Sequence, residues 1–133
     1  MYRLSFRTRS KVDFQDITLE VQKAVQSGGI ANGVCHIFVP HTTAGVTLNE
    51  HADPSVVDDI AARFDILAPE NIRYRHLEGN APAHVKASLV GSSAAVFVED
   101  KQLVLGTWQG VFLCEFDGPR DRTVLVKVTP DKP

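Results

Sequence analysis

The sequence has no large excess of charge of either sign, few cysteines and no long apolar run. Its 133 residues carry 14 Lys and Arg against 16 Asp and Glu, which gives a net charge of -2. Nonspecific binding to nucleic acid or to an acidic membrane surface needs a clear basic excess, so neither partner is expected. No apolar stretch approaches the length of a membrane span, and the first residues lack the apolar core of a signal peptide. A cytoplasmic protein is therefore expected.

The two cysteines, Cys35 and Cys114, each lie in an apolar run. Cysteines in such runs are commonly buried free thiols, which fits a reducing cytosol, although the sequence leaves one disulfide between them open. A chain of 133 residues can bury most of its apolar surface without a disulfide scaffold. No linker, repeat or low-complexity segment divides it. One domain over residues 1–133 is therefore expected.

The pattern of apolar residues predicts both strands and helices. Alternation or short apolar runs predict strands over residues 2–6, 34–40, 46–48, 94–98, 103–105, 111–116 and 123–129. About three helices are predicted: one that ends at residues 27–29, one that begins at Asp53-Pro54, and one over residues 82–90. The inward stripe of the second helix is expected to be Val56, Val57, Ile60 and Phe64. Helices fall between the early strands and hairpins follow, so the sequence predicts a mixed sheet and an α+β fold.

Residues 75–86 concentrate polar groups in a way that covering a core does not require. They hold His76 and His84, Glu78, Asn80 and two cations. Imidazole is the commonest protein metal ligand and the usual acid-base group near neutral pH. His84 falls in the first turn of the predicted helix, where the helix dipole attracts anions and favours a neutral ring. A functional site is favoured here over two ordinary surface histidines.

Three segments carry a resemblance to a known family: HTTA at 41–44, EGNAPAHVKASLVGSS at 78–93, and LGTWQGVFLCEFDGPR at 105–120. With these segments the chain resembles the YjbQ-like family, often labelled secondary thiamine-phosphate synthase, over almost its whole length. The resemblance implies a small α+β domain with a β-sandwich-like mixed sheet, assembled as a homotrimer. It also implies a divalent metal, zinc being expected and magnesium the alternative, held by His41, His76 and His84. His51 falls where many relatives have another residue, and it is left out of the metal set.

The remaining polar residues suggest roles around such a metal. Three neutral imidazoles with an open fourth position are typical of a catalytic zinc site. Glu78 and Glu50 are candidates for a general base, for orienting a histidine, or for plain ion pairs. The candidates for catalysis or for binding a phosphorylated substrate are Thr42, Asn80, Lys86, Arg120 and Arg122.

Two structural alternatives stay open for these segments. Arg120 and Arg122 can equally form a solvated charged turn with Asp117 and Asp121. Trp108 can stack on a flat heterocycle, but a lone tryptophan in a strand-rich segment is more often part of the core.

Three hypotheses for function follow. The first is an enzyme that acts on phosphorylated heterocycles, with thiamine-phosphate synthesis as the implied and secondary reaction. The second is a metal-dependent hydrolase, in which a metal generates hydroxide. The third is a noncatalytic trimer that binds metal or a metabolite. Turnover separates the first two from the third, and a requirement for a diphosphate leaving group separates the first from the second.

Overall fold

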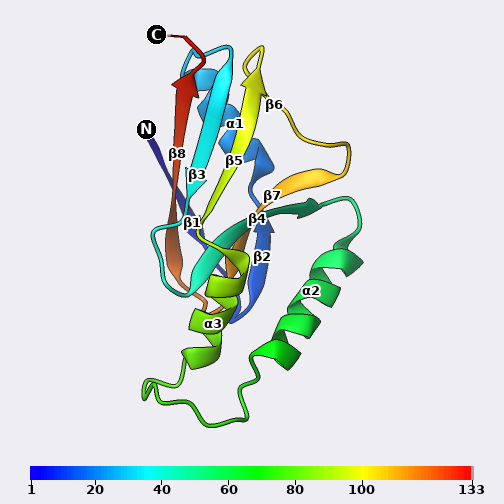
Figure 1. The fold of residues 1–133 in the computed structure, drawn as a ribbon, viewed down its shortest axis with the longest axis vertical. Helices are drawn as coiled ribbons and strands as arrows, with labels where there is room; N and C mark the ends of the chain where they lie inside the picture. The colour runs from blue at the N-terminus through cyan, green and yellow to red at the C-terminus, as the bar shows by residue number, and fades with distance from the viewer. Residues whose placement is uncertain (133) are drawn as a thin grey trace.

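The computed structural model describes residues 1–132, which form eight strands and three helices (Figure 1). The α+β class and the three expected helices are confirmed. The strands are β1 (Tyr2–Arg7), β2 (Asp13–Asp16), β3 (Gly33–Phe38), β4 (Ala44–Glu50), β5 (Ser93–Glu99), β6 (Gln102–Leu103), β7 (Gln109–Glu115) and β8 (Asp121–Pro130). The helices are α1 (Thr18–Ser27), α2 (Pro54–Leu67) and α3 (Ala81–Val90).

The strands form two sheets, one of five strands in the order β1-β8-β3-β5-β6 and one of three in the order β2-β7-β4. Every strand pair within residues 1–132 is antiparallel, so the prediction of a mixed sheet is wrong. Helix-containing connections predict parallel neighbours only when they return to the same sheet. Here α1 leads from the three-stranded sheet to the five-stranded one, and the segment with α2 and α3 does the same.

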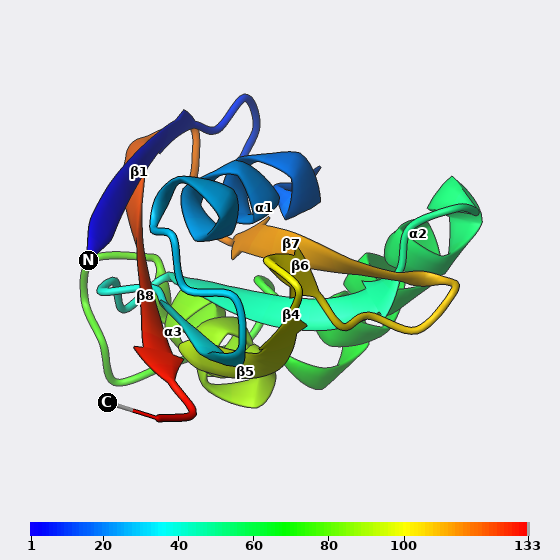
Figure 2. The same cartoon turned by 90° about the horizontal axis from the view of Figure 1, so that it is seen from above.

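The main core lies between α1 and the inner faces of both sheets, as the view from above shows (Figure 2). Ile17, Val21 and Val25 of the α1 segment are at most 1% exposed. They pack with alternate residues of the strands, such as Ile37 of β3 and Leu113 of β7. The alternation seen in the sequence therefore fixes which side of β3 and β8 is buried.

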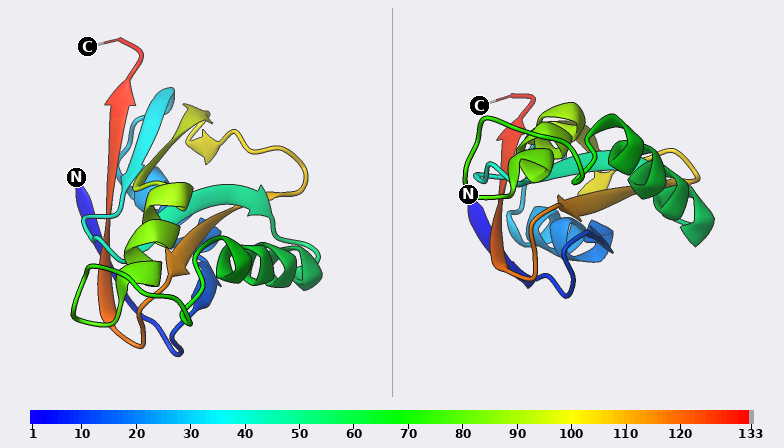
Figure 3. Two further views of the ribbon diagram at one scale, coloured as in Figure 1. Left: turned by 60° about the horizontal axis from the view of Figure 1, so that its bottom comes forward. Right: turned by 90° about the horizontal axis from the view of Figure 1, so that it is seen from below.

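A second, smaller core lies on the other face of the three-stranded sheet, under α2 and α3 (Figure 3). Phe116 is its centre, with Phe14 and Phe64 in edge-to-face contact at ring-centroid distances of 5.7 and 6.0 Å. Ala83 and Ala87 of α3 pack against the same cluster. None of the residues of α2 is buried, so its expected inward stripe of Val56, Val57, Ile60 and Phe64 is only partly covered.

The start of α2 and the end of α3 follow the predicted signals. The Asp53 side chain accepts a hydrogen bond from the backbone N–H of Ser55, and Pro54 occupies the first turn of α2. Helix α3 stops at Gly91, whose φ of +95° is a conformation that glycine adopts without strain. Strand β2 was not predicted, because its four residues, Asp13–Asp16, show no apolar alternation.

Both cysteines are free and buried, as expected. Burial raises the pKa of the Cys35 thiol to about 11 and that of Cys114 to about 12, so both stay protonated at neutral pH. Trp108 is 63% exposed, so of its two alternatives the core position is wrong; Phe112, on the strand β7, is buried instead. Among residues 1–132, the helices are all too short or too polar to cross a membrane.

Candidate functional site

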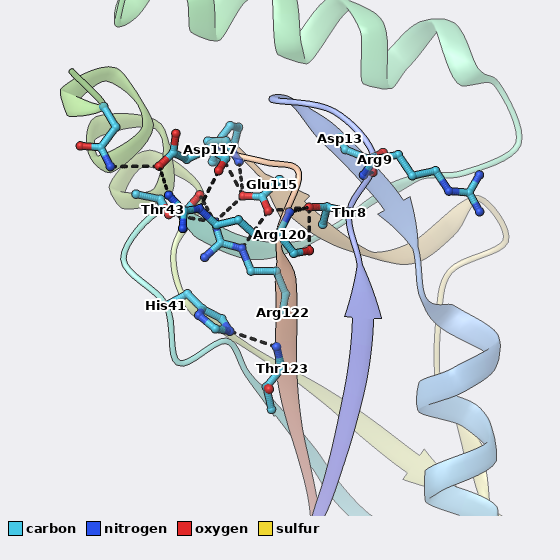
Figure 4. Close-up of polar contacts among 12 residues, drawn as sticks. Thr8, Arg9, Asp13, His41, Thr43, Glu115, Asp117, Arg120, Arg122 and Thr123 are labelled. Atoms are coloured by element: carbon cyan, nitrogen blue, oxygen red, sulfur yellow. Dashed lines mark hydrogen bonds and ion pairs between the residues drawn. The ribbon is translucent and has the colours of Figure 1, made fainter. Parts of the chain in front are cut away.

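A buried ion pair between Arg122 of β8 and Glu115 of β7 lies at the centre of the site (Figure 4). The two side chains are 5% and 0% exposed. The guanidinium donates from Nε to Glu115 Oε1 over 2.8 Å and from Nη2 to Glu115 Oε2. Nη2 also donates to the Thr43 hydroxyl over 2.8 Å. These bonds fix the plane of the guanidinium.

The Glu115 carboxylate has further donors besides Arg122. The Thr8 hydroxyl donates to Oε1 over 2.7 Å, and the backbone N–H groups of Phe116 and Asp117 donate to Oε2 over 3.0 and 3.1 Å. Burial raises the pKa of Glu115, but the hydrogen bonds and the Arg122 charge more than offset it, so the pKa lies below its usual value. The buried pair is therefore ionised and fully paired on the carboxylate side.

Arg122 keeps one nitrogen, Nη1, that makes no hydrogen bond within residues 1–132. In this part of the chain the only buried side-chain atom without a partner is Asn80 Oδ1, so Nη1 is not completely shielded from solvent. Arg122 lines a hollow of about 360 Å³, which we call the polar hollow. Its other polar side chains include those of His41, Thr42, Glu78, Asn80, His84 and Arg120. The pair with Glu115 thus holds a cation at the wall of a cavity.

A second hollow, which we call the α3 groove, shares His41, Thr42 and His84 with the polar hollow. Its volume is about 550 Å³. The rest of its lining consists of small uncharged residues: Ala44, Ala87, Ser88, Gly91 and Ser92. The two hollows together therefore offer a charged end and a neutral end to one ligand.

His41 stands where the two hollows meet, and its ring is held by the neighbouring strand. Its Nε2 accepts a hydrogen bond of 3.0 Å from the backbone N–H of Thr123 (Figure 4). Burial and the nearby Arg122 charge lower the pKa of His41, so the ring is neutral at pH 7. A neutral ring that accepts through Nε2 carries its hydrogen on Nδ1. His41 is therefore a hydrogen-bond donor here, without a free lone pair for a metal.

His76 and His84 do come together, with their rings edge to face at a centroid distance of 5.1 Å. His84 is on α3, and His76 is in the loop that precedes it. Within residues 1–132, no group of three His, Cys, Asp or Glu side chains is arranged to hold a metal. The metal site of His41, His76 and His84 therefore stays a prediction. The three side chains do not form such a group within one chain.

Arg120 lies at the edge of the polar hollow and is bound to Asp117. It donates from Nε to the Asp117 carbonyl over 2.8 Å and from Nη2 to the Asp117 carboxylate over 3.0 Å. Asn80, the residue that precedes α3, donates to the same carboxylate over 2.9 Å. Burial raises the pKa of Asp117, but these bonds more than offset it, and the pKa lies below its usual value. For Arg120 the geometry favours the charged turn that the sequence left as an alternative.

Two predicted site residues lie elsewhere. Lys86 is 3% exposed, forms an ion pair with Asp65 of α2, and lines neither hollow. It follows His84 by two positions, which is about 200° around a helix, so the two side chains leave α3 in different directions. Glu50 lines a third hollow together with Asp16 and His51, whereas Glu78 lines the polar hollow.

Sequence reasoning missed Glu115 and Thr43, which bind Arg122, and Thr8, which donates to Glu115. A signal for Glu115 was present, because it is the one charged residue in the otherwise apolar run 111–116. A carboxylate that is buried in a strand needs a cationic partner. The sequence does not say which arginine supplies it, since Arg120 and Arg122 are close in the chain.

One protein family and several related sequences match nearly the whole chain. The family described as "UPF0047 protein YjbQ-like" matches residues 2–131. The UPF0047 protein YugU of Bacillus subtilis is 50% identical over 126 residues, which are 94% of this chain and 96% of that protein. A UPF0047 protein of Methanocaldococcus jannaschii is 45% identical over 132 residues, 99% of this chain and 96% of that protein.

Solved structures also match this chain over nearly its whole length. A YjbQ/UPF0047 protein from Clostridium acetobutylicum has a TM-score of 0.95 at 49% identity, covering 97% of this chain and 100% of that one. A protein from Sulfolobus solfataricus has a TM-score of 0.94 at 34% identity, covering 98% and 96%. The names of these relatives state a family and not a reaction.

Proposed function

The chain belongs to the YjbQ-like UPF0047 family, and on that premise we propose that it binds a small phosphorylated heterocycle across the polar hollow and the α3 groove. The proposal includes an enzymatic role in which the chain forms thiamine phosphate as a secondary activity. Arg122 is the observation that carries it. An arginine that is locked by a carboxylate, lines a cavity and keeps one nitrogen without a hydrogen bond is suited to bind an anion.

Some of the other groups of the polar hollow are donors for the same anion. The hydrogen on His41 Nδ1 and the Thr42 hydroxyl are neutral donors, and both residues line the hollow with Arg122. The start of α3, next to Asn80, adds the positive end of a helix dipole. A phosphate would therefore take the charged end, and the uncharged walls of the α3 groove would contact a ring.

In the proposed reaction, the nitrogen of thiazole phosphate attacks the methylene carbon of a pyrimidine-methyl diphosphate. A carbon–nitrogen bond forms, the carbon–oxygen bond breaks, and pyrophosphate leaves with the bonding electrons. Arg122 would hold a phosphoryl group, and the groove would align the two rings. This exchange of bonds transfers no proton, so Glu78, which lines the polar hollow, would move a proton only in the hydrolase alternative. Lys86 and Glu50 have no role in this proposal, because neither lines these two hollows.

The reaction is tested by incubating the protein with both phosphorylated heterocycles and measuring thiamine phosphate and pyrophosphate. We expect equal amounts of the two products, with much slower formation by an Arg122→Lys variant. An Arg63→Lys variant is the matched control, because Arg63 is exposed on α2 and outside both hollows. Phosphate release without the thiazole partner would favour the hydrolase hypothesis. Absence of any turnover would favour the hypothesis of a noncatalytic binding protein.

A divalent metal, zinc or alternatively magnesium, is proposed on His76 and His84. Two imidazoles suit zinc better than magnesium, which prefers oxygen ligands. His41 does not fit as a third ligand while its Nε2 accepts the bond from Thr123. The metal would act as a Lewis acid near the phosphate when bound.

The metal proposal predicts different results for two histidine variants. Equilibrium dialysis against zinc, followed by elemental analysis, should show one bound ion per chain in the wild type. A His84→Ala variant should lose it, whereas His41→Ala should retain it. Loss in both variants would instead support the set of three histidines, and retention in both would remove His84 from the ligands.

An exposed apolar face of the five-stranded sheet supports the proposal that the chain forms a homotrimer. On the face of the five-stranded sheet opposite α1, Phe97 of β5 is 70% exposed and Phe38 of β3 is 44% exposed. Val34, opposite Phe97 in the register, lies on the same face. Exposed aromatic residues that gather on one face are typical of an interface.

The trimer predicts a solution mass of three times the chain mass of 14.6 kDa. Light scattering at micromolar protein measures it. A Phe97→Ser variant should shift the mass toward the monomer, because it removes apolar area from the interface. Leu19→Ser is the control, since Leu19 is 71% exposed on α1, away from this face. A monomeric wild type, or equal masses for the two variants, would contradict the proposal.

A further inference from the structure

Thr43 lies beside the Arg122 guanidinium and is almost completely covered by the chain (Figure 4). It is 6% exposed, and it directly precedes β4 in the segment that lines the polar hollow. Its hydroxyl oxygen accepts the 2.8 Å hydrogen bond from Arg122 Nη2, and its carbonyl accepts from the backbone N–H of Phe116 over 3.1 Å. Rotation of the Thr43 side chain would break the bond to Arg122, so these contacts fix its orientation.

The hydroxyl hydrogen of Thr43 has no acceptor within residues 1–132, because the hydroxyl forms a single side-chain hydrogen bond there and accepts in it. A hydroxyl carries one donor hydrogen besides its two lone pairs. Since a guanidinium N–H approaches the oxygen, the hydrogen points away from Arg122. A donor on a residue that is this well covered costs free energy when nothing accepts from it. Thr43 lines the polar hollow, so a bound molecule can supply the acceptor.

The backbone of residues 41–43 adds further free donors. In the part of the chain that the structure describes, the N–H groups of His41, Thr42 and Thr43 donate to no carbonyl and to no side chain. All three residues line the polar hollow, and His41 and Thr42 also line the α3 groove. Successive backbone N–H groups without partners form anion-binding sites in proteins. The segment therefore carries donors of two kinds, a hydroxyl and backbone amides, next to Arg122.

The carboxylates that line the same hollow belong to other segments. Asp117 already accepts from Arg120 Nη2 and from Asn80 Nδ2, and Glu78 is exposed in the loop before α3. Within residues 1–132, neither carboxylate accepts a hydrogen bond from Arg122 or from residues 41–43. The donors of this wall are therefore uncommitted.

We propose that Thr43 is a further ligand-binding residue, which donates its hydroxyl hydrogen to one oxygen of a terminal phosphoryl group while Arg122 binds another. The backbone N–H groups of residues 41–43 supply donors for the third oxygen. The bond from Arg122 Nη2 polarises the hydroxyl and strengthens it as a donor. This inference rests on the proposed binding of a phosphorylated ligand, and it narrows that ligand to a phosphate monoester or a diphosphate. A carboxylate or a phosphodiester has only two terminal oxygens and leaves part of these donors without an acceptor.

Two probes with the same ring test the proposal: phenyl phosphate, which has three terminal oxygens, and benzoate, which has two. Calorimetric titration at pH 7.5 and low salt measures both affinities. The Thr43→Val variant keeps the shape of the side chain and removes the hydroxyl. It should bind phenyl phosphate about tenfold more weakly than the wild type, as expected for the loss of one hydrogen bond to a charged group. Its affinity for benzoate should fall by less than about threefold.

Three matched variants separate binding from folding. Thr43→Ser keeps the hydroxyl, so its affinity for phenyl phosphate should stay within about threefold of the wild type. Thr43→Ala lacks the hydroxyl and should repeat the loss seen in Thr43→Val. Thr47→Val removes a hydroxyl from β4 outside both hollows, and should leave both affinities unchanged. Circular dichroism checks that each variant is folded.

Two results would overturn the role of Thr43 alone. Equal losses for phenyl phosphate and benzoate in Thr43→Val would show that Thr43 acts only by holding Arg122. Unchanged affinity for phenyl phosphate in Thr43→Val, with weaker binding in Arg122→Lys, would leave the phosphate site at Arg122 without a contribution from Thr43. A wild type that binds neither phenyl phosphate nor pyrophosphate would instead contradict both this inference and the proposed function.

Discussion

Replacement of Arg122 with methionine is expected to lower the free energy of unfolding by about 3–5 kcal/mol. The side chain is 5% exposed and its partner Glu115 is 0% exposed. Without the guanidinium, the Glu115 carboxylate keeps only the Thr8 hydroxyl and two backbone N–H groups. A buried charge that has lost its counter-charge carries most of its desolvation cost uncompensated. This single change should therefore cost more than a typical core substitution.

Urea denaturation of the wild type and of three variants measures the effect. Arg122→Met and Glu115→Gln each leave one partner without the other, whereas the double variant removes both charges. The double variant should be more stable than Arg122→Met alone, because no unpaired charge stays buried. A loss of less than about 1 kcal/mol in Arg122→Met would show that water reaches the pair.

The pH dependence of stability follows from the same carboxylate. The pKa of Glu115 is lowered in the folded chain, so the folded state binds protons more weakly than the unfolded state. The stability that this group contributes is therefore complete above the usual glutamate pKa and is lost as the pH falls through the lowered value. The Glu115→Gln variant should lack this part of the acid destabilisation. Identical pH profiles for wild type and variant would contradict the assignment.

Substitution of Arg122 by lysine is expected to weaken binding of thiazole phosphate and of pyrophosphate by about ten- to a hundredfold. The arginine holds Glu115 through Nε and Nη2, while Nη1 makes no hydrogen bond and the residue lines the polar hollow. Lysine has one nitrogen, which cannot hold the carboxylate and reach a ligand in the same way. Because lysine keeps the charge beside Glu115, the loss in the free energy of ligand binding should exceed the loss in the free energy of unfolding.

Calorimetric titration with both ligands measures this prediction, and Arg120→Lys is its control. Arg120 lines the same hollow but is tied to Asp117 through Nε and Nη2, and its side chain is 53% exposed. Its replacement should change affinity by less than about threefold. The reverse order, with the larger loss in Arg120→Lys, would move the phosphate to the outer turn and would refute the role of Arg122.

The local elements of this protein are determined by short-range patterns in its sequence. Alternation over β1 and β3 and the Asp53-Pro54 and Pro82–Gly91 signals fix strand faces and helix ends, because they act through backbone conformation and neighbouring residues. The polar segment at the start of α3 also indicated a candidate site by composition alone. His84, Glu78 and Asn80 do line one hollow with His41.

Only the tertiary structure decided which of these polar side chains meet. Arg122 meets Glu115 across the short connection from β7 to β8, and the register of β7 with β4 brings Thr43 from a distant part of the chain to the same pair. The same packing turns Lys86 toward Asp65 and leaves Glu50 beside His51 in another hollow. A sequence pattern cannot specify such pairs, because each depends on the relative placement of two sheets and two helices. The proposed role of Arg122 as an anion ligand, and the hydrogen bond that sets the role of the His41 ring, therefore depend on the folded chain.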